Sequence, residues 1–575
     1  MEGNLFDSID GVAAGDGQAA PWAARSPFRP EAERDLMLVP RVRGAWADDE
    51  RAREALARIV ADPAVAAVRE HEKGIDVRLD DDWIEARGEP LESGVADPDA
   101  NADLVAGERY AVYFWGANTT KALHVGHLRN LALGNAIAAA LRVGGARVES
   151  RSLICDVGRS MGEAMAGVVA SGRDDDELGS ENGEKSDHFV GLCYADYVRA
   201  GREGAGDDGA EDSVARESAL YDDKADELMM RVLDGDQRAL ELWSKTRAWV
   251  ISGQRKTLAR LGVPFDKVIF ESDFLPEVAE LTNLGLREGT LRRREDGMVI
   301  YPTEREELEE MPLVRADGLP TQHMRALAYW AAAPELDGVT SLQVCGTEWV
   351  AHVTCRRQLL DALAVARSNG HPNPVANGNG AGGPPTHDVF HGMVARRGEA
   401  VSSSKQGALL IDEMVEWADR TIATDPELEA VRRAHPQPDR IAARVILAWF
   451  LLQPTSKRVE FAPDLLFEPE RSLGWDIVCA QAQRSGVAVG AGAAGGGSPA
   501  SGGAEDPDYR FAVVQAELFR RHLRSAVADL DPVPLARYLS HFARWYAAAE
   551  RSPRVEAVAQ AVLDEGVRGL GLEAA

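Results

Sequence analysis

The chain has 575 residues, too many for one hydrophobic core, and a length of this size predicts about three or four domains. Its hydrophobic share of 45% is ordinary for a soluble protein. We expect neither secretion nor a membrane span, because the sequence has no basic and apolar leader and no long apolar run. The formal net charge of −29 works against non-specific binding of nucleic acid, although it allows a specific RNA on a local basic face.

The cysteines are odd in number and scattered along the chain, without the spacing of a metal site. This usage is typical of a reducing compartment, so we predict a cytoplasmic protein with no structural metal. The five residues are Cys155, Cys193, Cys345, Cys355 and Cys479.

The N-terminal part predicts a tail followed by a small domain. Residues 1–33 are rich in Gly, Ala, Pro and Asp and have no sustained period, so we predict a disordered tail. In residues 34–104, helical spacing of apolar residues indicates a helix within Glu50–Val68, and Gly74–Leu79 alternates like a strand. These elements predict a small α/β domain.

A His-x-Gly-His stretch follows a strand and opens a helix. Tyr110–Trp115 is an apolar run that predicts a buried strand, and helical spacing begins near His127. Free backbone N–H groups and the helix dipole favour an anion at this point, Gly126 allows close approach, and histidine adds a donor. The alternative is an ordinary strand–turn–helix connection, in which the two histidines have no role in ligand binding. A zinc site is disfavoured, because His124 and His127 lie without a cysteine or carboxylate cluster.

A second strand, Val148–Ile154, ends at Asp156 and Gly158, another strand–helix junction. Strands that alternate with helices predict a Rossmann-type parallel sheet, whose ligands bind beyond the carboxyl ends of the strands. We assign residues 105–420 to this domain. Also predicted within it are a helical insertion at 171–260 with a break at 201–212, a strand at Lys267–Phe270, a helix at Gln322–Ala331, a strand at Ser341–Val344, a Gly/Asn/Pro-rich insertion at 368–386 and a strand at Val389–Val394.

A Ser-rich loop with one lysine, Val401-Ser-Ser-Ser-Lys405-Gln-Gly, follows the last predicted strand. Most loops of this composition are solvated turns. From Ile411 the periodicity is helical almost to the end, which predicts a helical domain at 421–575. A linker of Gly, Ala and Ser at 486–505 interrupts it.

An early His-x-Gly-His helix start, a Ser/Lys loop at the far end of an α/β core and a helical tail together resemble the class I aminoacyl-tRNA synthetases. Within this class, the chain resembles the arginyl-tRNA synthetase family from about Val65 to the C-terminus. The resemblance is carried by Asn118, Lys121 and His124-Val-Gly-His127-Leu-Arg; Asp156-Val-Gly158-Arg; Lys185-Ser-Asp-His-Phe-Val-Gly; Arg260-Leu-Gly-Val-Pro-Phe-Asp with Glu271-Ser; Asp317-Gly318; Val344-Cys-Gly346 with His352; and Phe461-Ala-Pro-Asp with Ala480-Gln-Ala-Gln-Arg484.

The resemblance implies a ligase that activates an amino acid with ATP and Mg²⁺ and transfers it to tRNA. It implies catalytic roles for His124, His127 and Lys405, with Mg²⁺ held mostly by phosphates and water. Gly126 would leave space for the nucleotide base. The implied ATP contacts are Lys121, His124, Gly126, His127, Gly346, Met393, Val394, Ser404 and Lys405.

The resemblance also implies the amino-acid contacts. Asn118 would hold the α-amino end, Glu271 would face a guanidinium, and Asp156 would lie beside them. Residues 34–104 resemble a reduced tRNA-elbow-binding domain and residues 421–575 an anticodon-binding domain. The implied partners are tRNA and arginine or an analogue, bound by a monomer without a membrane contact.

The expected side-chain pocket departs from the family pattern. After its Asp-Gly pair the family carries a tyrosine and, four residues later, an aspartate, where this chain has Gln322 and Ala326. Residues four apart share one helix face, as a pocket wall requires. A family glutamine is replaced by the bulkier Trp349. An unpaired buried donor costs on the order of 1–3 kcal/mol, so we predict weakened arginine discrimination unless neighbours such as His323 or Glu348 compensate.

Three functions therefore stay open. The chain is an arginine-tRNA ligase, a paralogue that activates a different amino acid for a specialised pathway, or a non-catalytic RNA- or protein-binding relic. Retention of His124, His127 and Lys405 favours an active enzyme over a relic, since a relic has no need of groups that hold ATP.

Overall fold

The computed structural model describes most of the chain, and within the described part no helix has the length and apolar character that crossing a membrane requires. The Ser/Lys loop lies outside this part, as do nearly all of the predicted Gly/Asn/Pro-rich insertion and Gly/Ala linker. The described residues are 9, 22–25, 34–40, 47, 49–71, 73–92, 101, 103–173, 184–204, 223–306, 308–332, 338–367, 386–396, 409–467, 472–483, 503–548 and 552–573.

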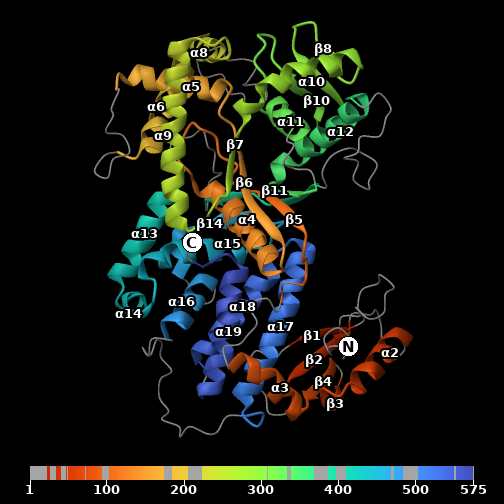
Figure 1. Ribbon diagram of the computed structural model, residues 1–575. Coiled ribbons are helices and arrows are strands. Elements are labelled where there is room, and N and C mark those ends of the chain that lie inside the picture. Colours follow the sequence, from red (N-terminus) through yellow and green to blue (C-terminus); the bar gives the residue numbers. More distant parts are fainter. Residues whose placement is uncertain are drawn as a thin grey trace.

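A five-stranded parallel sheet forms the middle of the molecule (Figure 1). Its strand order is β12-β11-β5-β6-β7, and every neighbouring pair is parallel. The predicted parallel α/β core is therefore confirmed. The strands are β5 (Arg109–Tyr113), β6 (Arg147–Ile154), β7 (Lys267–Phe270), β11 (Thr340–Gly346) and β12 (Thr386–His391).

The helix α4 (Val125–Val143) connects β5 to β6 and is buried along most of its length, because it packs between the sheet and the C-terminal helices. Gly134 allows this packing: a Cβ there would lie 2.2 Å from the Phe114 ring. β5 has β6 on one side and β11, from much later in the chain, on the other. Such a reversal of strand order opens a crevice at the carboxyl ends of the two strands, where ligands of these sheets bind.

Two lobes extend from the carboxyl ends of the strands (Figure 1). One is helical, as predicted, and consists of α5 (Arg159–Ser171), α6 (Ser186–Gly204), α8 (Asp223–Leu233) and α9 (Gln237–Leu261). The other surrounds an antiparallel sheet that the sequence did not predict, and its helix α11 confirms the one expected at Gln322–Ala331. It contains η3 (Glu271–Phe274), α10 (Leu275–Arg287), β8 (Arg292–Arg293), β9 (Val299–Arg305), β10 (Leu308–Val314), α11 (Gln322–Ala332), η5 (Thr347–Trp349) and α12 (Val350–Arg367).

In the described residues, the N-terminal domain is an antiparallel sheet in the order β1-β2-β4-β3 with the helices α2 and α3. The helix expected within Glu50–Val68 ends at Val60, because the following Ala-Asp-Pro cannot continue it, and the residues after Pro63 form a strand. A short strand also stands at Trp22–Arg25, where we expected a disordered tail. The elements are β1 (Trp22–Arg25), β2 (Leu36–Pro40), α2 (Glu50–Val60), β3 (Val65–His71), β4 (Gly74–Leu79) and α3 (Asp81–Glu92).

The C-terminal part is helical, as predicted, apart from one strand that pairs with the core. The strand expected at Val389–Val394 is divided, because Gly392 leaves the sheet and donates a hydrogen bond to the Thr455 carbonyl at 2.9 Å. Beyond it β13 (Val394–Arg396) pairs with β14 (Val459–Phe461). The helices are α13 (Ile411–Thr424), α14 (Pro426–Ala434), η6 (Pro438–Arg440), α15 (Ile441–Leu451), η7 (Pro463–Phe467), α16 (Leu473–Gln483), α17 (Pro507–Asp529), α18 (Val533–Ala548) and α19 (Pro553–Gly569).

The first and last parts of the chain pack together, with α3 against α17 and α19 (Figure 1). Arg510 of α17 reaches into the N-terminal sheet, where Nη2 and Nε donate to the Asp35 carboxylate at 2.8 and 3.1 Å. Nη2 also donates to the Leu79 carbonyl at 2.6 Å. The N-terminal domain is therefore fixed to the helical domain by a buried guanidinium.

Candidate active site

His124 caps the N-terminus of α4. Its Nδ1 atom accepts a hydrogen bond from the Gly126 N–H at 3.2 Å, and its own N–H donates to Nδ1 of His127 at 3.1 Å. Because both Nδ1 atoms accept, each neutral ring carries its proton on Nε2. Two side-chain N–H donors thus stand at the start of a helix whose dipole favours an anion.

Both imidazoles are neutral near pH 7. Burial lowers the pKa of His124 to about 2, and the neighbouring His127 and Lys121 add to this effect. Burial also lowers the pKa of His127 to about 4. The pair therefore offers hydrogen bonds rather than full charges, and Lys121, whose pKa burial lowers to about 8, is the cation beside it.

Gly126 makes room for the histidine cap. A Cβ atom there would lie 2.9 Å from Cε1 and 3.0 Å from Nδ1 of His124, closer than side-chain atoms pack. The resemblance implies that this glycine leaves space for a nucleotide base. In the structure the space next to Gly126 is taken by the His124 ring, so the residue serves the cap.

The loop between β5 and α4 is held by Gln254 of α9. The buried Gln254 amide donates to the carbonyls of Asn118 at 3.1 Å and Lys121 at 2.8 Å. Asn118 also forms a parallel bridge with Cys155 at the end of β6. The helical lobe therefore positions the loop that carries two of the expected ligand contacts.

The segment that follows the Ser/Lys loop in the sequence pairs with the histidine segment. Ser404 and Lys405 lie outside the described residues, so the structure does not place them. Residues 409–411 pair with residues 123–125 through backbone hydrogen bonds of 2.9 and 3.0 Å and an antiparallel bridge. The downstream end of the loop is thereby attached to the His124 segment.

The remaining expected ATP contacts lie at the carboxyl ends of β11 and β12. Gly346 ends β11, and the carboxylate of Glu348 folds over it, so that a Cβ on Gly346 would lie 2.1 Å from that carboxylate. Met393 is 50% exposed, whereas Val394 is 7% exposed. Of these three expected contacts, Met393 is the side chain that a ligand can reach directly.

A largely buried ionic cluster fixes the start of α13. Lys185 Nζ lies 2.8 Å from Asp187 and 2.9 Å from Asp412, which His188 approaches at 3.1 Å. Burial acts to raise the pKa of Asp412, but the His188 hydrogen bond and the Lys185 charge outweigh it and lower the pKa to about 2. Burial raises the pKa of Asp187 despite Lys185. The Lys185 motif therefore anchors the helix that follows the Ser/Lys loop.

A cavity of about 120 Å³ opens at the carboxyl ends of the central strands, in the crevice between β5 and β11. Gln322 and Ala326 line it from one face of α11, as their spacing predicts. The structure therefore brings together residues that are far apart in the sequence. The expected amino-acid contacts in its wall are Asn118, Glu271, Gln322, Ala326 and Trp349.

Glu271 already faces a guanidinium of the chain itself. Its Oε2 atom accepts a hydrogen bond from Nε of Arg325 at 2.8 Å, and these side chains are 2% and 3% exposed. Arg325 also donates to the Pro320 carbonyl and lies 3.1 Å from Sγ of Cys155. Burial raises the pKa of Glu271, and the Arg325 charge opposes this rise. The expected partner of Glu271, a substrate guanidinium, is here replaced by an internal ion pair.

Asp156, also expected at the amino acid, is absent from the described residues that line the cavity. Its carboxylate accepts hydrogen bonds from Arg247 at 2.8 Å and from the Ser272 hydroxyl at 2.7 Å. Its carbonyl accepts from Trp243 Nε1 at 2.7 Å, and the residue is fully buried. Asp156 therefore ties the end of β6 to α9 and η3, and its contact with the amino acid stays a prediction.

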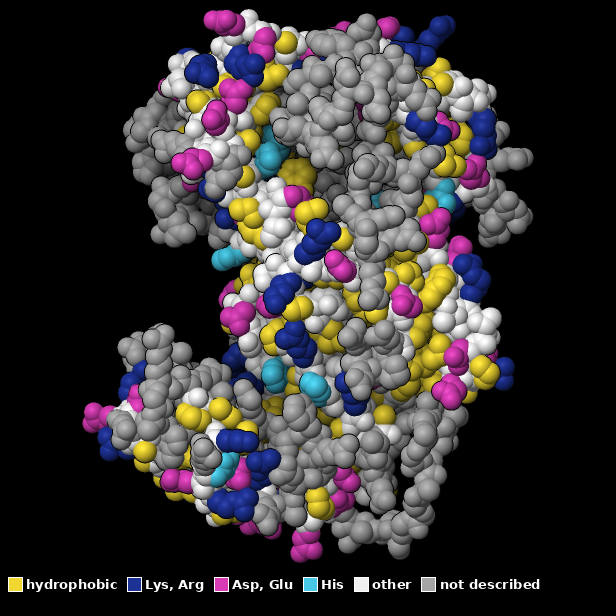
Figure 2. All heavy atoms as spheres, turned by 180° about the vertical axis from the view of Figure 1, so that it is seen from behind, with side chains coloured by type: hydrophobic (Ala, Val, Ile, Leu, Met, Phe, Trp, Pro, Cys, Tyr) yellow, Lys and Arg dark blue, Asp and Glu magenta, His cyan; other side chains and the backbone are white. Residues whose placement is uncertain are grey.

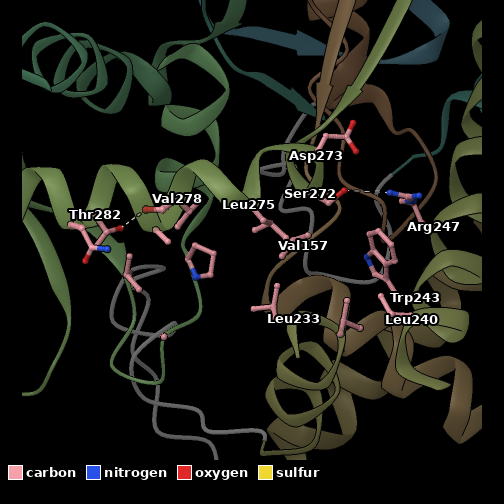
Figure 3. Close-up of a pocket in the computed structure, with 16 residues that line it drawn as sticks. Val157, Leu233, Leu240, Trp243, Arg247, Ser272, Asp273, Leu275, Val278 and Thr282 are labelled. Carbon is pink, nitrogen blue, oxygen red and sulfur yellow. Dashed lines mark hydrogen bonds between the residues drawn. The ribbon is translucent and has the colours of Figure 1, made fainter. Parts of the chain in front are cut away.

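A larger cavity of about 640 Å³ lies between α8 and α9 on one side and α10 on the other. Figure 3 shows Arg247 next to Trp243 and hydrogen-bonded to Ser272, with Leu275 and Val278 on the facing wall. Cζ of Arg247 lies 4.1 Å from the Trp243 ring. Among the described residues that line this larger cavity, none is an expected ATP or amino-acid contact. We therefore place the candidate active site at the smaller cavity.

Sequence reasoning missed two arginines at the smaller cavity. Arg325 stands one position before Ala326, but no pattern indicates that it turns toward Glu271. Arg356 lines the cavity from α12, where its Nη2 atom donates to Oε1 of Gln343 at 2.6 Å. Its position four residues after His352, on the same helix face, is a signal that could have placed it.

Comparison with known proteins gives one consistent result, although no family model matches the chain. An arginine–tRNA ligase of Amoebophilus asiaticus is 28% identical over 387 residues, which are 64% of this chain and 59% of that protein. One of Borrelia hermsii is 27% identical over 276 residues, 46% of this chain and 44% of that protein. The chain thus spans about half the length of the curated relatives it matches.

Solved structures agree over the whole fold. The arginyl-tRNA synthetase of Thermus thermophilus superposes with a TM-score of 0.63 at 19% identity and covers 99% of both chains. That of Plasmodium falciparum has a TM-score of 0.62 at 13% identity and covers 99% of this chain and 96% of its own. The chain is therefore similar in sequence to arginine–tRNA ligases over about half of their length, and it has the fold of the solved arginyl-tRNA synthetases.

Proposed function

We propose that this protein activates an amino acid with ATP and transfers it to tRNA. The observation that carries the proposal is the pair of Nε2–H donors on His124 and His127 at the N-terminus of α4, the helix whose Asn130 lines the cavity between β5 and β11. The relatives that the sequence matches are arginine–tRNA ligases, and their names support the same chemistry.

The reaction has two steps. An α-carboxylate oxygen of the amino acid attacks the α-phosphorus of ATP, so a new oxygen–phosphorus bond forms while the bond to pyrophosphate breaks. A ribose hydroxyl at the 3′ end of tRNA then attacks the activated carbonyl carbon, and AMP leaves. Neither step needs a covalent bond to the protein, which has to position the reactants and neutralise charge.

The residues at the site divide this work. His124 and His127 would donate hydrogen bonds to phosphate oxygens, and Lys121 would supply positive charge next to them. Lys405 would neutralise the leaving pyrophosphate, since it is four residues before Leu409 and the chain between them spans at most about 14 Å. Asn118, in the cavity wall, would hold the α-amino end of the amino acid.

Mg²⁺ belongs to the same proposal. The part of the chain that the structure describes contains no group of three His, Cys, Asp or Glu side chains placed to hold a metal ion. The ion would therefore be held by ATP phosphates and water, and it would neutralise phosphate charge.

The partners and domain roles form a further part of the proposal. Residues 34–104 would contact the tRNA elbow, residues 105–420 would carry out the chemistry, and residues 421–575 would contact the anticodon stem, in a cytoplasmic monomer. Despite the net charge of −29, Figure 2 shows Lys and Arg side chains among the acidic ones on the face seen from behind. Such local basic groups are what binding of a tRNA backbone needs.

Amino-acid-dependent exchange of pyrophosphate into ATP tests the proposal. The complete set of amino acids is assayed with and without tRNA, because the resemblance implies that tRNA must be present for activation. We expect exchange with at least one amino acid. No exchange under any condition, together with no binding of ATP in calorimetry, would identify a non-catalytic relic instead.

A further inference from the structure

The cavity at the carboxyl ends of β5 and β11 has an unusual balance of charge for a guanidinium site. Among its described lining residues, Glu271 is the one carboxylate, and Nε of Arg325 lies 2.8 Å from it. Both side chains are nearly inaccessible, so the pair is internal to the protein. The negative charge of Glu271 is thereby balanced before any substrate enters.

A second arginine lines the same cavity and has no matching carboxylate in the wall. Arg356 donates to the neutral amide of Gln343, and its Cζ atom lies 5.8 Å from the Trp330 ring. Asp388, on the neighbouring strand β12, is bound by Arg357 at 2.8 Å and also attracts the charge of Arg356. Two arginines therefore share this carboxylate, and among the described residues that line the cavity Arg356 is a cation whose hydrogen-bond partner is neutral.

The other titratable groups of the wall do not change this balance. Burial lowers the pKa of His323 to about 3, so its ring is neutral. Burial raises the pKa of Cys155 and of Cys345 to about 12, so both thiols are neutral. None of these groups adds a charge near pH 7, and the exposed carboxylate of Glu348 is not among the described residues of the wall. Arg356 is therefore the cation of the described wall without a carboxylate hydrogen-bonded to it.

The charge of Arg356 determines which kind of amino-acid side chain the cavity can bind. A substrate guanidinium would meet the like charge of Arg356 in a poorly hydrated cavity, where repulsion is stronger than in water. An oxygen acceptor would instead bind the planar N–H fork of Arg356, which suits carboxylates in particular. The indole rings of Trp330 and Trp349 complete the wall and favour a short guest.

We propose that this cavity selects an amino acid whose side chain ends in an oxygen acceptor, a carboxylate or a primary amide, and rejects arginine, with Arg356 as the specificity-determining residue. The inference rests on the proposed function, because it assigns the amino acid of that same reaction. Aspartate, glutamate, asparagine and glutamine are the standard amino acids of this class.

The test is pyrophosphate exchange by the full-length protein with these four amino acids and with arginine, in the presence of total tRNA. We expect kcat/KM for one of the four to exceed that for arginine at least about 100-fold. Comparison of the two acids with the two amides shows whether the cavity prefers a carboxylate or a primary amide. Exchange that is strongest with arginine overturns the inference and leaves the proposed function standing, whereas no exchange with any amino acid removes the proposed function itself.

Two variants test the role of Arg356. Arg356→Leu should raise KM for the preferred amino acid at least about 100-fold while KM for ATP is unchanged, and Arg356→Lys should restore part of the loss for a carboxylate guest. Gln358→Leu, on the exposed face of the same helix, is the matched control. Equal amino-acid preference in Arg356→Leu and the unaltered protein would contradict the assignment.

Discussion

The guanidinium of Arg510 makes two hydrogen bonds to the carboxylate of Asp35, and these side chains are 1% and 4% exposed. The contact joins a helix of the C-terminal part to the first described strand pair of the chain. Arg78 also approaches Asp35, at 3.4 Å, but from within the N-terminal domain. Because breaking a buried ion pair is costly, we expect Arg510 to hold the N-terminal domain against the helical domain.

Arg510→Ala should lower the free energy of unfolding by about 3 kcal/mol, because Asp35 then keeps, among the described residues, only the partly exposed Arg78, at 3.4 Å, as a cationic partner. Urea denaturation measures the loss, and limited proteolysis should release the N-terminal domain first. Arg520→Ala is the control, because Arg520 pairs on the surface with Asp103 at 35% and 72% exposure and should cost less than about 1 kcal/mol. Equal losses in the two variants would contradict a docking role.

The histidine pair should not titrate in the physiological range. The folded-state pKa of His124, about 2, lies below the unfolded value of 6.5, so the unfolded chain binds more protons between these limits. Stability should therefore fall as pH drops below about 6.5, by up to about 1.4 kcal/mol per pH unit for this residue. NMR titration of the ring protons checks this, with His124→Asn as a variant that keeps a cap. A ring inflection near pH 6.5 would refute the burial argument.

Gly126→Ala should weaken ATP binding without unfolding the protein. The added Cβ would push the His124 ring out of its cap, and losing aligned hydrogen bonds of about 1–3 kcal/mol corresponds to roughly a 10- to 100-fold higher dissociation constant. Calorimetry with a non-hydrolysable ATP analogue measures the effect. Gly569→Ala is the control, since a Cβ there meets atoms at 3.7 Å or more. If Gly126→Ala binds the ATP analogue as tightly as the unaltered protein, the position of the His124 ring does not affect nucleotide binding.

Lys185→Met should leave Asp187 and Asp412 close together without their shared cation. The pKa values of these carboxyl groups should rise, so the variant should be less stable than the unaltered protein at pH 7 and recover as pH falls and one carboxyl is protonated. Thermal unfolding at pH 7.5 and pH 5 measures the difference. The double variant Lys185→Met/Asp187→Asn should regain stability at pH 7.5, and a loss that is the same at both pH values would contradict the charge argument.

The periodicity of apolar residues predicted much of the fold. The parallel core, the helix at Gln322–Ala332 and the helical tail follow from runs whose apolar spacing matches their burial. The three-stranded sheet β8–β10 was missed because β8 has two residues and because β9 and β10 each contain a proline, Pro302 and Pro312, without strict alternation. Residues 65–68 were taken into a helix because the break at Pro63 was not weighed against the apolar spacing. In both cases the strand is stabilised by pairing with the next strand along the chain, β9 with β10 and β3 with β4, which the intrinsic preference of a single segment does not reveal.

Five of the six residues expected to contact the amino acid line the cavity, but the sequence did not predict the charged groups that surround them. Asn118, Glu271, Gln322, Ala326 and Trp349 do meet in one cavity. Their sequence order says nothing of which group neutralises which, because that depends on side-chain direction in the folded chain. Arg325 and Arg356 therefore escaped notice until their contacts were visible.

The strand order has a consequence for how the chain is made. β5 pairs with β6 soon after it is synthesised, but its other edge waits for β11, whose Thr340 lies opposite Tyr110. At ordinary ribosomal speeds the interval is on the order of tens of seconds. During that time an apolar strand has an unpaired edge, which invites aggregation. Production of this protein should therefore depend on chaperones that shield nascent β5 until the ribosome has passed β11.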